Sequence, residues 1–289
     1  MTGLLVGTEA GLWQDGRRLA EGRVADVATA PAGGWVAVVD GRVVTSDGAP
    51  AVPVPGPAAT CVAALGSAAV VGTAEAHLVI VDGGQARRLE SFDSAEGRDR
   101  WYTPWGGPPD TRSLAVGGDG ALWVNVHVGG IVRSGDGGAT WRPTIDVDAD
   151  VHQVVVAGDR VVAATARGLA TSADQGATWA FATEGLHGAY ARAVAVAGEW
   201  LLLSASTGPY TDRSAVYRRP LAAPEGVPFE RCSPWFTENI DTGLLAAAGD
   251  GTSAALAAPD GALYRSADAG ASWEPAPGPP APVTALAFA

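Results

Sequence analysis

The sequence predicts an all-β fold: a single seven-bladed β-propeller whose first blade is completed by the C-terminal strand. Three observations support this prediction: a phrase that occurs three times, seven recurring pairs of short apolar runs, and turn residues between the runs. Repetition with a period of about 40 residues is typical of propellers built from four-stranded blades. The 39 glycines and 20 prolines among 289 residues also favour many turns and strands over long helices.

The repeated phrase has the pattern S-x-D-x-G-x-[TS]-W. It spans Ser134–Trp141, Ser172–Trp179 and Ser266–Trp273, each time after a short apolar run. The spacing between the second and third copies leaves room for one enlarged unit without the phrase. Asp-Gly pairs flanked by apolar runs, a strong hairpin signal, mark the equivalent turn in three further units, at residues 15–16, 47–48 and 82–83.

The apolar runs predict two strands for each of seven units. The first strand of each unit is rich in small residues, as expected for the innermost strand of a blade, and is expected at 24–30, 61–66, 113–118, 153–158, 193–198, 245–249 and 283–289. The second is expected at 35–39, 69–73, 122–128, 161–165, 200–204, 253–257 and 4–7. The resulting single domain has blades at approximately 283–289 with 3–22, 24–56, 59–92, 111–146, 151–184, 191–235 and 242–278.

The repeated phrase resembles the Asp-box, or BNR repeat, of sialidases and related β-propellers. The resemblance covers three blades, and the other four follow from the strand pattern alone. It implies that Asp136, Asp174 and Asp268 are structural, accepting backbone N–H groups in a turn, while the tryptophan packs between sheets. Sialidase activity is not implied, because the Arg-Ile-Pro motif of that family is absent from the sequence.

Composition argues against several partners. The net charge of −12 disfavours binding to a phosphate backbone. No run approaches the roughly 20 apolar residues of a membrane-spanning helix. The first residues, 1–6, are interpreted as the start of a strand rather than a signal peptide, and the cysteines Cys61 and Cys232 are well separated. We therefore expect a cytoplasmic protein with reduced cysteines that binds neither nucleic acid nor membrane; its oligomeric state stays open.

One half of the propeller mouth is predicted to be polar. The position just before the innermost strand is Thr284, Ala25 and Thr60 in blades 1 to 3, but Arg112, His152 and Arg192 in blades 4 to 6, and Gly243 in blade 7. Loops at the mouth of such a fold commonly carry ligand sites. Further polar residues expected near this half are Asp110, Asp150, Tyr190, Glu238, Asn239 and Asp241.

Three of the four histidines belong to this face. His127 ends a strand in which Asn125 points the same way, His152 begins the next blade, and His187 precedes blade 6. Three imidazoles could bind Zn²⁺, Mn²⁺ or Fe²⁺ and leave positions open for water or substrate. The alternatives are histidines that perform acid–base chemistry without a metal, or histidines with only a structural role.

The charged residues suggest an anionic ligand. Arg112 and Arg192 suit a carboxylate or phosphate, because a guanidinium binds such groups bidentately. Alternatively, each arginine pairs with Asp110 or Asp241 across the channel. Acid–base pairs as in glycoside hydrolysis are to be sought among the carboxylates Asp110, Asp150, Glu238 and Asp241.

Two insertions frame the polar half. Residues 94–110 contain Trp101, Tyr102 and Trp105, which are expected either to cover a sugar or planar ring or to pack over the channel end. Residues 207–219 and 222–235 enlarge blade 6. Long loops in a compact domain are more often functional than not.

The sequence thus predicts a hydrolase or lyase that acts on a small polar or anionic molecule at the mouth, with or without a divalent metal. His127, His152 and His187 would be acid–base groups or metal ligands, and Asp241 or Glu238 a second acid–base group. Arg112, Arg192, Asn125, Tyr190, Asn239, Asp110 and Trp105 would bind the substrate. The alternative is a non-catalytic propeller that serves as a protein-assembly scaffold or a glycan-binding module.

Overall fold

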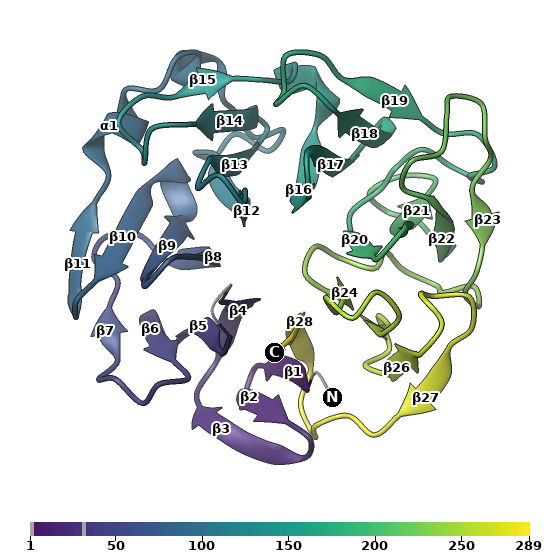
Figure 1. Cartoon of the computed structure of the whole chain (residues 1–289), viewed down its shortest axis with the longest axis horizontal. Coiled ribbons are helices and arrows are strands. Elements are labelled where there is room, and N and C mark those ends of the chain that lie inside the picture. Colours follow the sequence, from purple (N-terminus) through teal and green to yellow (C-terminus); the bar gives the residue numbers. More distant parts are fainter. Residues whose placement is uncertain (1–2, 31–32) are drawn as a thin grey trace.

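The structure, a computed structural model, describes residues 3–30 and 33–289. Within these residues, seven four-stranded antiparallel sheets are arranged in a ring (Figure 1), which confirms the predicted seven-bladed β-propeller. The strands of blades 1 to 3 are β28 (Val283–Phe288), β1 (Leu4–Thr8), β2 (Gly11–Gln14) and β3 (Arg17–Glu21); β4 (Val24–Thr29), β5 (Trp35–Val39), β6 (Arg42–Thr45) and β7 (Val52–Pro53); and β8 (Ala59–Leu65), β9 (Ala68–Thr73), β10 (Leu78–Asp82) and β11 (Gln85–Arg88).

Blades 4 to 7 repeat this plan. Their strands are β12 (Asp110–Val116), β13 (Leu122–His127), β14 (Gly130–Ser134) and β15 (Arg142–Pro143); β16 (Val151–Ala157), β17 (Arg160–Thr165), β18 (Gly168–Ser172) and β19 (Ala180–Ala182); β20 (Val194–Ala197), β21 (Trp200–Ser206), β22 (Ser214–Pro220) and β23 (Glu230–Arg231); and β24 (Leu245–Ala247), β25 (Ala254–Ala257), β26 (Leu263–Ser266) and β27 (Glu274–Ala276). The only α-helix among the described residues, α1 (Glu90–Asp93), is one turn long. None of the described helices has the length and apolar character needed to cross a membrane.

The C-terminal strand closes the ring as predicted. β28 lies innermost in blade 1 and pairs antiparallel with β1, where Leu5 faces Ala287. The backbone N–H of Gly3 donates to the carbonyl of Ala289 at 2.7 Å and extends the pairing beyond the strand. Closure of this kind leaves only short sheet edges exposed.

The core lies between neighbouring blades. At the blade 5–6 interface, for example, Leu169 packs with Leu201 and Tyr217, all of them buried. The strand alternation that sends apolar residues into these interfaces also fixes which side chains of the innermost strands point toward the channel.

The three phrase turns are held by their own side chains. Asp136 accepts the backbone N–H groups of Ala139 and Thr140 at 3.0 and 2.9 Å, and the Ser134 hydroxyl accepts that of Gly138. The Thr140 hydroxyl and backbone hydrogen bonds hold the pKa of Asp136 well below its usual value. Hydrogen bonds from Thr178 lower the pKa of Asp174 to about 2 in the same way.

The phrase tryptophans pack against the preceding blade. Trp141 of blade 4 donates from Nε1 to the Ser91 hydroxyl at 3.2 Å and lies edge-on to Phe92, with ring centroids 4.9 Å apart. Trp179 of blade 5 donates to the carbonyl of Thr144 in blade 4 at 2.8 Å. Aspartate and tryptophan therefore have structural contacts, and neither needs a ligand to explain it.

A β-bulge occurs at the same place in five innermost strands. The register shifts leave one unpaired residue in each, namely Thr284, Ala25, Thr60, Arg112 and His152. The sequence prediction began the strands after Thr60, Arg112 and His152, whereas β8, β12 and β16 begin two or three residues earlier than predicted. A bulge redirects a side chain and often lies next to a site, so the equivalence of these positions is a property of the backbone.

Candidate functional site

A cavity of about 590 Å³ opens at the bulged end of the channel. Its wall includes Arg112, His127 and Asp110 of blade 4, Asp241 of the loop before blade 7, and Trp105 of the insertion before blade 4. Blades 1 and 2 contribute the smaller side chains of Thr284 and Ala25. Of the residues predicted for the polar half of the mouth, Asp110, Arg112 and Asp241 therefore line this cavity, together with His127 and Trp105.

Arg112 offers a guanidinium to this cavity. The side chain lies on the β12 bulge and makes no hydrogen bond and no ion pair with any residue in the described part of the chain. Burial lowers the Arg112 pKa, and the charge of Asp241 partly offsets that effect. An arginine remains protonated under such conditions, so Arg112 presents unsatisfied donors to whatever enters the cavity.

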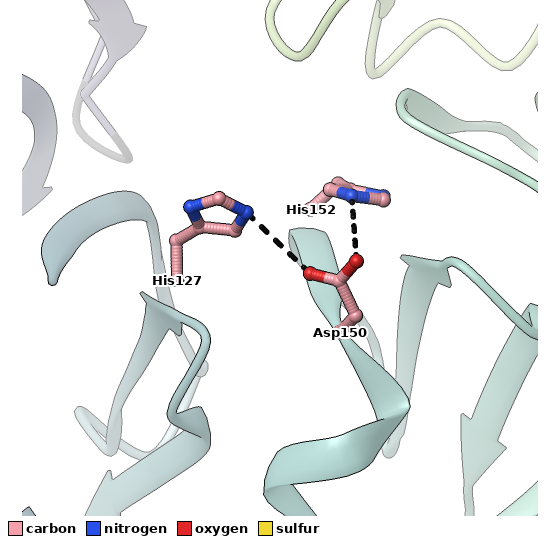
Figure 2. A group of neighbouring side chains, drawn as sticks. All are labelled: His127, Asp150 and His152. Atoms are coloured by element: carbon pink, nitrogen blue, oxygen red, sulfur yellow. Dashed lines mark ion pairs between the residues drawn. The ribbon is translucent and has the colours of Figure 1, made fainter. Parts of the chain in front are cut away.

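His127, Asp150 and His152 form a compact cluster beside this wall (Figure 2). The Asp150 carboxylate lies between the two rings, with one oxygen 3.5 Å from Nε2 of His127 and the other 3.6 Å from Nε2 of His152. The ligand atoms of all three residues lie within 4.8 Å of one another. His127 comes from the end of β13, and the other two residues from the start of blade 5.

The hydrogen bond made by Nδ1 fixes the orientation of the His152 ring. Nδ1 lies 2.7 Å from the carbonyl of Ala191, and a carbonyl only accepts, so Nδ1 carries a proton and donates. A neutral ring then has a lone pair on Nε2, facing Asp150. The His152 side chain is fully buried, and this Nε2 has no hydrogen-bond partner among the described residues.

Asp150 is placed by an unusual backbone conformation. It caps the short 3-10 helix η3 (Val147–Ala149) with φ 47° and ψ 71°, in the left-handed region. Aspartate tolerates this region better than most residues, and the turn raises the carboxylate to the level of both rings. Burial opposes ionisation of Asp150, but the neighbouring rings of His152 and His127 and the guanidinium of Arg112 keep its pKa below the usual value.

The electrostatics of the wall keep His127 neutral at pH 7. Burial and then the positive charge of Arg112 lower the His127 pKa to about 4, and the Asp150 carboxylate only partly opposes them. A neutral imidazole has one ring nitrogen with a free lone pair, so it acts as a base or a metal ligand rather than as an acid. The sequence predicted both roles for this residue.

Aromatic and charged groups lie on both sides of the His127–Asp150–His152 cluster. The Trp105 ring is 5.1 Å from the His127 ring, and the Tyr190 ring is 4.8 Å from that of His152. Arg192 pairs with Asp241 at 2.5 Å, the arrangement that the sequence analysis left open as an alternative. Arg192 is thus neutralised by a carboxylate, and Arg112 is not.

His187 does not join the other histidines, so the predicted three-histidine cluster is wrong in its third member. Its Nδ1 contacts the Tyr217 hydroxyl at 2.7 Å, and its Nε2 contacts the carbonyl of Arg213 at 3.1 Å. The Trp235 ring lies edge-on at 4.8 Å. Both ring nitrogens are engaged, because the long loops of blade 6 enclose His187 on their own side of the molecule.

Glu238, Asn239 and Trp101 also lie outside the cavity wall. Glu238 is exposed, and Asn239 donates to the carbonyls of Gly208 and Pro209, which fixes the blade 6 loop. Trp101 is buried against Phe92, 5.5 Å between centroids, and does not cover the mouth. Of the three aromatic residues of that insertion, only Trp105 reaches the cavity, with 70% of its surface exposed.

Asn125 lies at the blade 4–5 interface, on the same face of β13 as His127, and not in the cavity wall where a substrate-binding residue was expected. It is fully buried, between Trp123 and His127 on one face of β13, and Trp123 packs among blade 5 residues. Neither its amide oxygen nor its nitrogen has a hydrogen-bond partner among the described residues. Asn125 therefore lies below the His–Asp–His cluster rather than in contact with the cavity.

Sequence reasoning missed Asp26 of blade 2. Its two carboxylate oxygens accept the backbone N–H groups of Val62 and Val27 at 2.8 and 2.9 Å, which ties blade 2 to blade 3. Burial raises the Asp26 pKa to about 7, and the two backbone hydrogen bonds only partly oppose this. The bulge places Asp26 in the cavity wall, and a bulge cannot be recognised from strand alternation alone.

Comparisons with known proteins assign the fold. No family model and no curated protein matches the chain. Among solved structures, a GH74 xyloglucanase from Xanthomonas campestris matches 96% of this chain at 18% identity with a TM-score of 0.61, and the chain spans 47% of that enzyme. YCF48 from Cyanidioschyzon merolae matches 95% at 16% identity, with a TM-score of 0.59 and 88% of its own length covered.

A third similar structure is a nidogen/laminin complex. The match covers 100% of this chain and 98% of the other chain, at 10% identity and a TM-score of 0.61. Such identities establish the fold alone, since one fold supports many functions. By these comparisons the chain is a seven-bladed β-propeller similar in structure to GH74 enzymes and to YCF48, and the resemblance of its phrase to the Asp-box stays a prediction.

Proposed function

We propose that this protein binds a small anionic molecule, a carboxylate or a phosphate, in the mouth cavity and hydrolyses it there. The observation that carries the proposal is Arg112, a guanidinium without a carboxylate partner in the described structure, lining a cavity of about 590 Å³. A cavity of this size is within the range of small-molecule sites. Arg112 would hold the anion bidentately.

The His127–Asp150–His152 cluster supplies the chemistry in this proposal. In a hydrolysis, the oxygen of water bonds to the electrophilic atom, the cluster accepts the released proton, and the leaving group takes up a proton as its bond breaks. His127 lines the cavity, and Asp150 orients it from the opposite side. Trp105 would lie over a sugar or planar ring bound beside His127.

Binding is tested on the full-length protein with a panel of inorganic phosphate, small carboxylates and uronic acids, followed by thermal shift and calorimetry. Arg112→Ala is compared with Arg42→Ala, which removes an exposed arginine of blade 2. Because hydrogen bonds to charged groups contribute about 1.5–3 kcal/mol, Arg112→Ala is expected to weaken binding about 10- to 150-fold. Equal binding by both variants, or no binding of any anion, contradicts the proposal.

Hydrolysis is tested with esters, phosphate esters and uronic acid glycosides. Asp150→Asn is expected to reduce turnover of any accepted substrate, whereas His187→Gln, on a histidine outside the cavity, is expected to leave it unchanged. Turnover that survives Asp150→Asn would remove the cluster from the reaction.

The alternative function is a non-catalytic propeller, and one comparison favours it. This chain matches 89% of the length of YCF48 in its complex with a D1 peptide, at 14% identity and a TM-score of 0.60. It matches less than half of the length of the GH74 enzymes. A single propeller is thus a complete unit in a peptide-bound protein. Binding of peptides at the mouth without turnover of any small anion would support this alternative. A cytoplasmic location stays a prediction in both cases.

A further inference from the structure

In the cluster beside the cavity, two hydrogen-bond acceptors face each other without a donor between them. The fully buried Nε2 of His152 bears a lone pair in the neutral ring and faces an Asp150 carboxylate oxygen at 3.6 Å without a hydrogen-bond partner among the described residues. The other Asp150 oxygen is also buried and makes no hydrogen bond there. Two facing acceptors in a poorly solvated position repel each other unless a proton or a cation lies between them.

The geometry points to a divalent transition-metal ion, Zn²⁺, Mn²⁺ or Fe²⁺, held by Nε2 of His127, the carboxylate of Asp150 and Nε2 of His152. This inference deepens the proposed function by assigning a cofactor to its site, and it rests on that function only for what the metal would do. It replaces the predicted ligand His187 with Asp150.

Two of the three separations fit such a centre. Metal–ligand bonds of about 2.1 Å at tetrahedral angles place ligand atoms about 3.4 Å apart. Nε2 of His127 lies 3.5 Å from one Asp150 oxygen, Nε2 of His152 lies 3.6 Å from the other oxygen, and one ligand atom from each residue lies within 4.8 Å of the other two. Two imidazoles and one carboxylate are a donor set for zinc and non-haem iron, and they leave coordination positions for water or a ligand.

The surroundings of the ligands also fit. Metal-binding histidines commonly donate their second N–H to a carbonyl or carboxylate, which fixes the ring, and His152 donates Nδ1–H to the Ala191 carbonyl at 2.7 Å. The backbone around the ligands is tied down as well. Ala166 N–H donates to the carbonyl of Asp150, and the Thr242 hydroxyl donates to that of His152.

The site is next to the proposed anion site. His127 belongs to both the cluster and the cavity wall, together with Arg112. An anion held by Arg112 would approach the open side of the metal. The metal would then polarise the anion or lower the pKa of bound water, the usual contributions of a catalytic divalent ion.

The test is metal binding by the full-length protein. Protein stripped with a chelator is titrated with Zn²⁺ and Mn²⁺ by calorimetry, and with Co²⁺ by visible absorption, which reports ligand geometry without any activity. The expected result is one ion per chain for wild type, with affinity reduced about 100-fold or more in Asp150→Asn and His127→Gln. His187→Gln serves as the matched control and is expected to bind like wild type.

Circular dichroism verifies the fold of each variant, and the wild-type Co²⁺ spectrum decides the question even if both ligand variants misfold. The inference is overturned if wild type binds none of these ions stoichiometrically, or if His187→Gln loses the ion while Asp150→Asn keeps it. Anion binding that depends on Arg112 in metal-free protein, with no metal binding, would remove this inference and leave anion binding in place. Stoichiometric metal binding without any anion binding would support this inference and contradict the proposed anion binding.

Discussion

The five bulged residues at the mouth separate into two groups that share a backbone but not a chemistry. Blades 1 to 3 carry Thr284, Ala25 and Thr60, whereas blades 4 and 5 carry Arg112 and His152. The bulge itself is therefore part of the ring's construction. Candidate functional groups occur where a bulge bears a charged or imidazole side chain and where an inserted loop lies beside that bulge.

The same two halves differ at their outer turns. Trp141, Trp179 and Trp273 occupy the interfaces that blades 4, 5 and 7 make with the preceding blade. Blade 3 has the turn residues Asp82 and Gly83 and no such tryptophan, and a groove of about 940 Å³ lies between blades 2 and 3. Blades 4 and 5, which bear the candidate site, thus each have a tryptophan at the interface with the preceding blade, which suits a site built across several blades.

The largest effect is expected from Trp141→Ala. Its loss removes a buried aromatic side chain and its hydrogen bond to Ser91, so the free energy of unfolding should fall by about 3–5 kcal/mol. Trp13→Ala in blade 1 is expected to cost less, because Trp13 is only half-buried and its Nε1 lacks a hydrogen-bond partner among the described residues. Urea unfolding measures both, and equal losses would erase the difference between the halves.

A smaller effect is expected from Ser172→Ala. Ser172 is buried and accepts the Gly176 N–H at 2.8 Å, so its loss leaves a buried donor unpaired and should cost about 1–3 kcal/mol. Thr45 at the equivalent turn of blade 2 is half-buried and donates to Asp47. Thr45→Ala should therefore change the melting temperature less than Ser172→Ala, as calorimetry can measure; the opposite order would show that the phrase adds no stability.

Trp105→Ala separates binding from stability. Because 70% of this side chain is exposed, the melting temperature should barely change. Loss of an aromatic contact of about 1 kcal/mol beside His127 should weaken binding of a ring-containing anion about 5-fold. Calorimetric titration tests this expectation. An unchanged affinity would show that Trp105 does not contact the bound anion on that side of the cavity.

A further effect is a pH dependence contributed by Asp26 in the half formed by blades 1 to 3. Its pKa is about 7 in the folded protein and near 3.8 when unfolded. The folded state therefore binds more protons between these values, and this stabilising contribution is lost as pH rises from about 4 to 7. Asp26→Asn should remove it. His127, with a folded pKa of about 4, works in the opposite direction but is common to both proteins, so the difference between their melting curves across pH isolates Asp26. No difference would show that Asp26 ionises normally.

The repeated phrase, the Asp-Gly turns and the seven pairs of apolar runs were sufficient to predict seven blades and their closure by residues 283–289. These signals are local, or repeat with a fixed period, and a period is visible in one dimension. Arg112, His127 and His152 were placed at one mouth for the same reason, because equivalent positions of equivalent blades meet around an axis.

Only the tertiary structure decided which polar groups touch. The left-handed conformation of Asp150 brings its carboxylate between two imidazoles, and the loops of blade 6 hold His187 away from them. It also decided that Arg192 is paired and Arg112 is not. Such contacts depend on differences of a few ångströms between loops that follow no period, and a bulge shifts side chains from the face that simple alternation assigns to them.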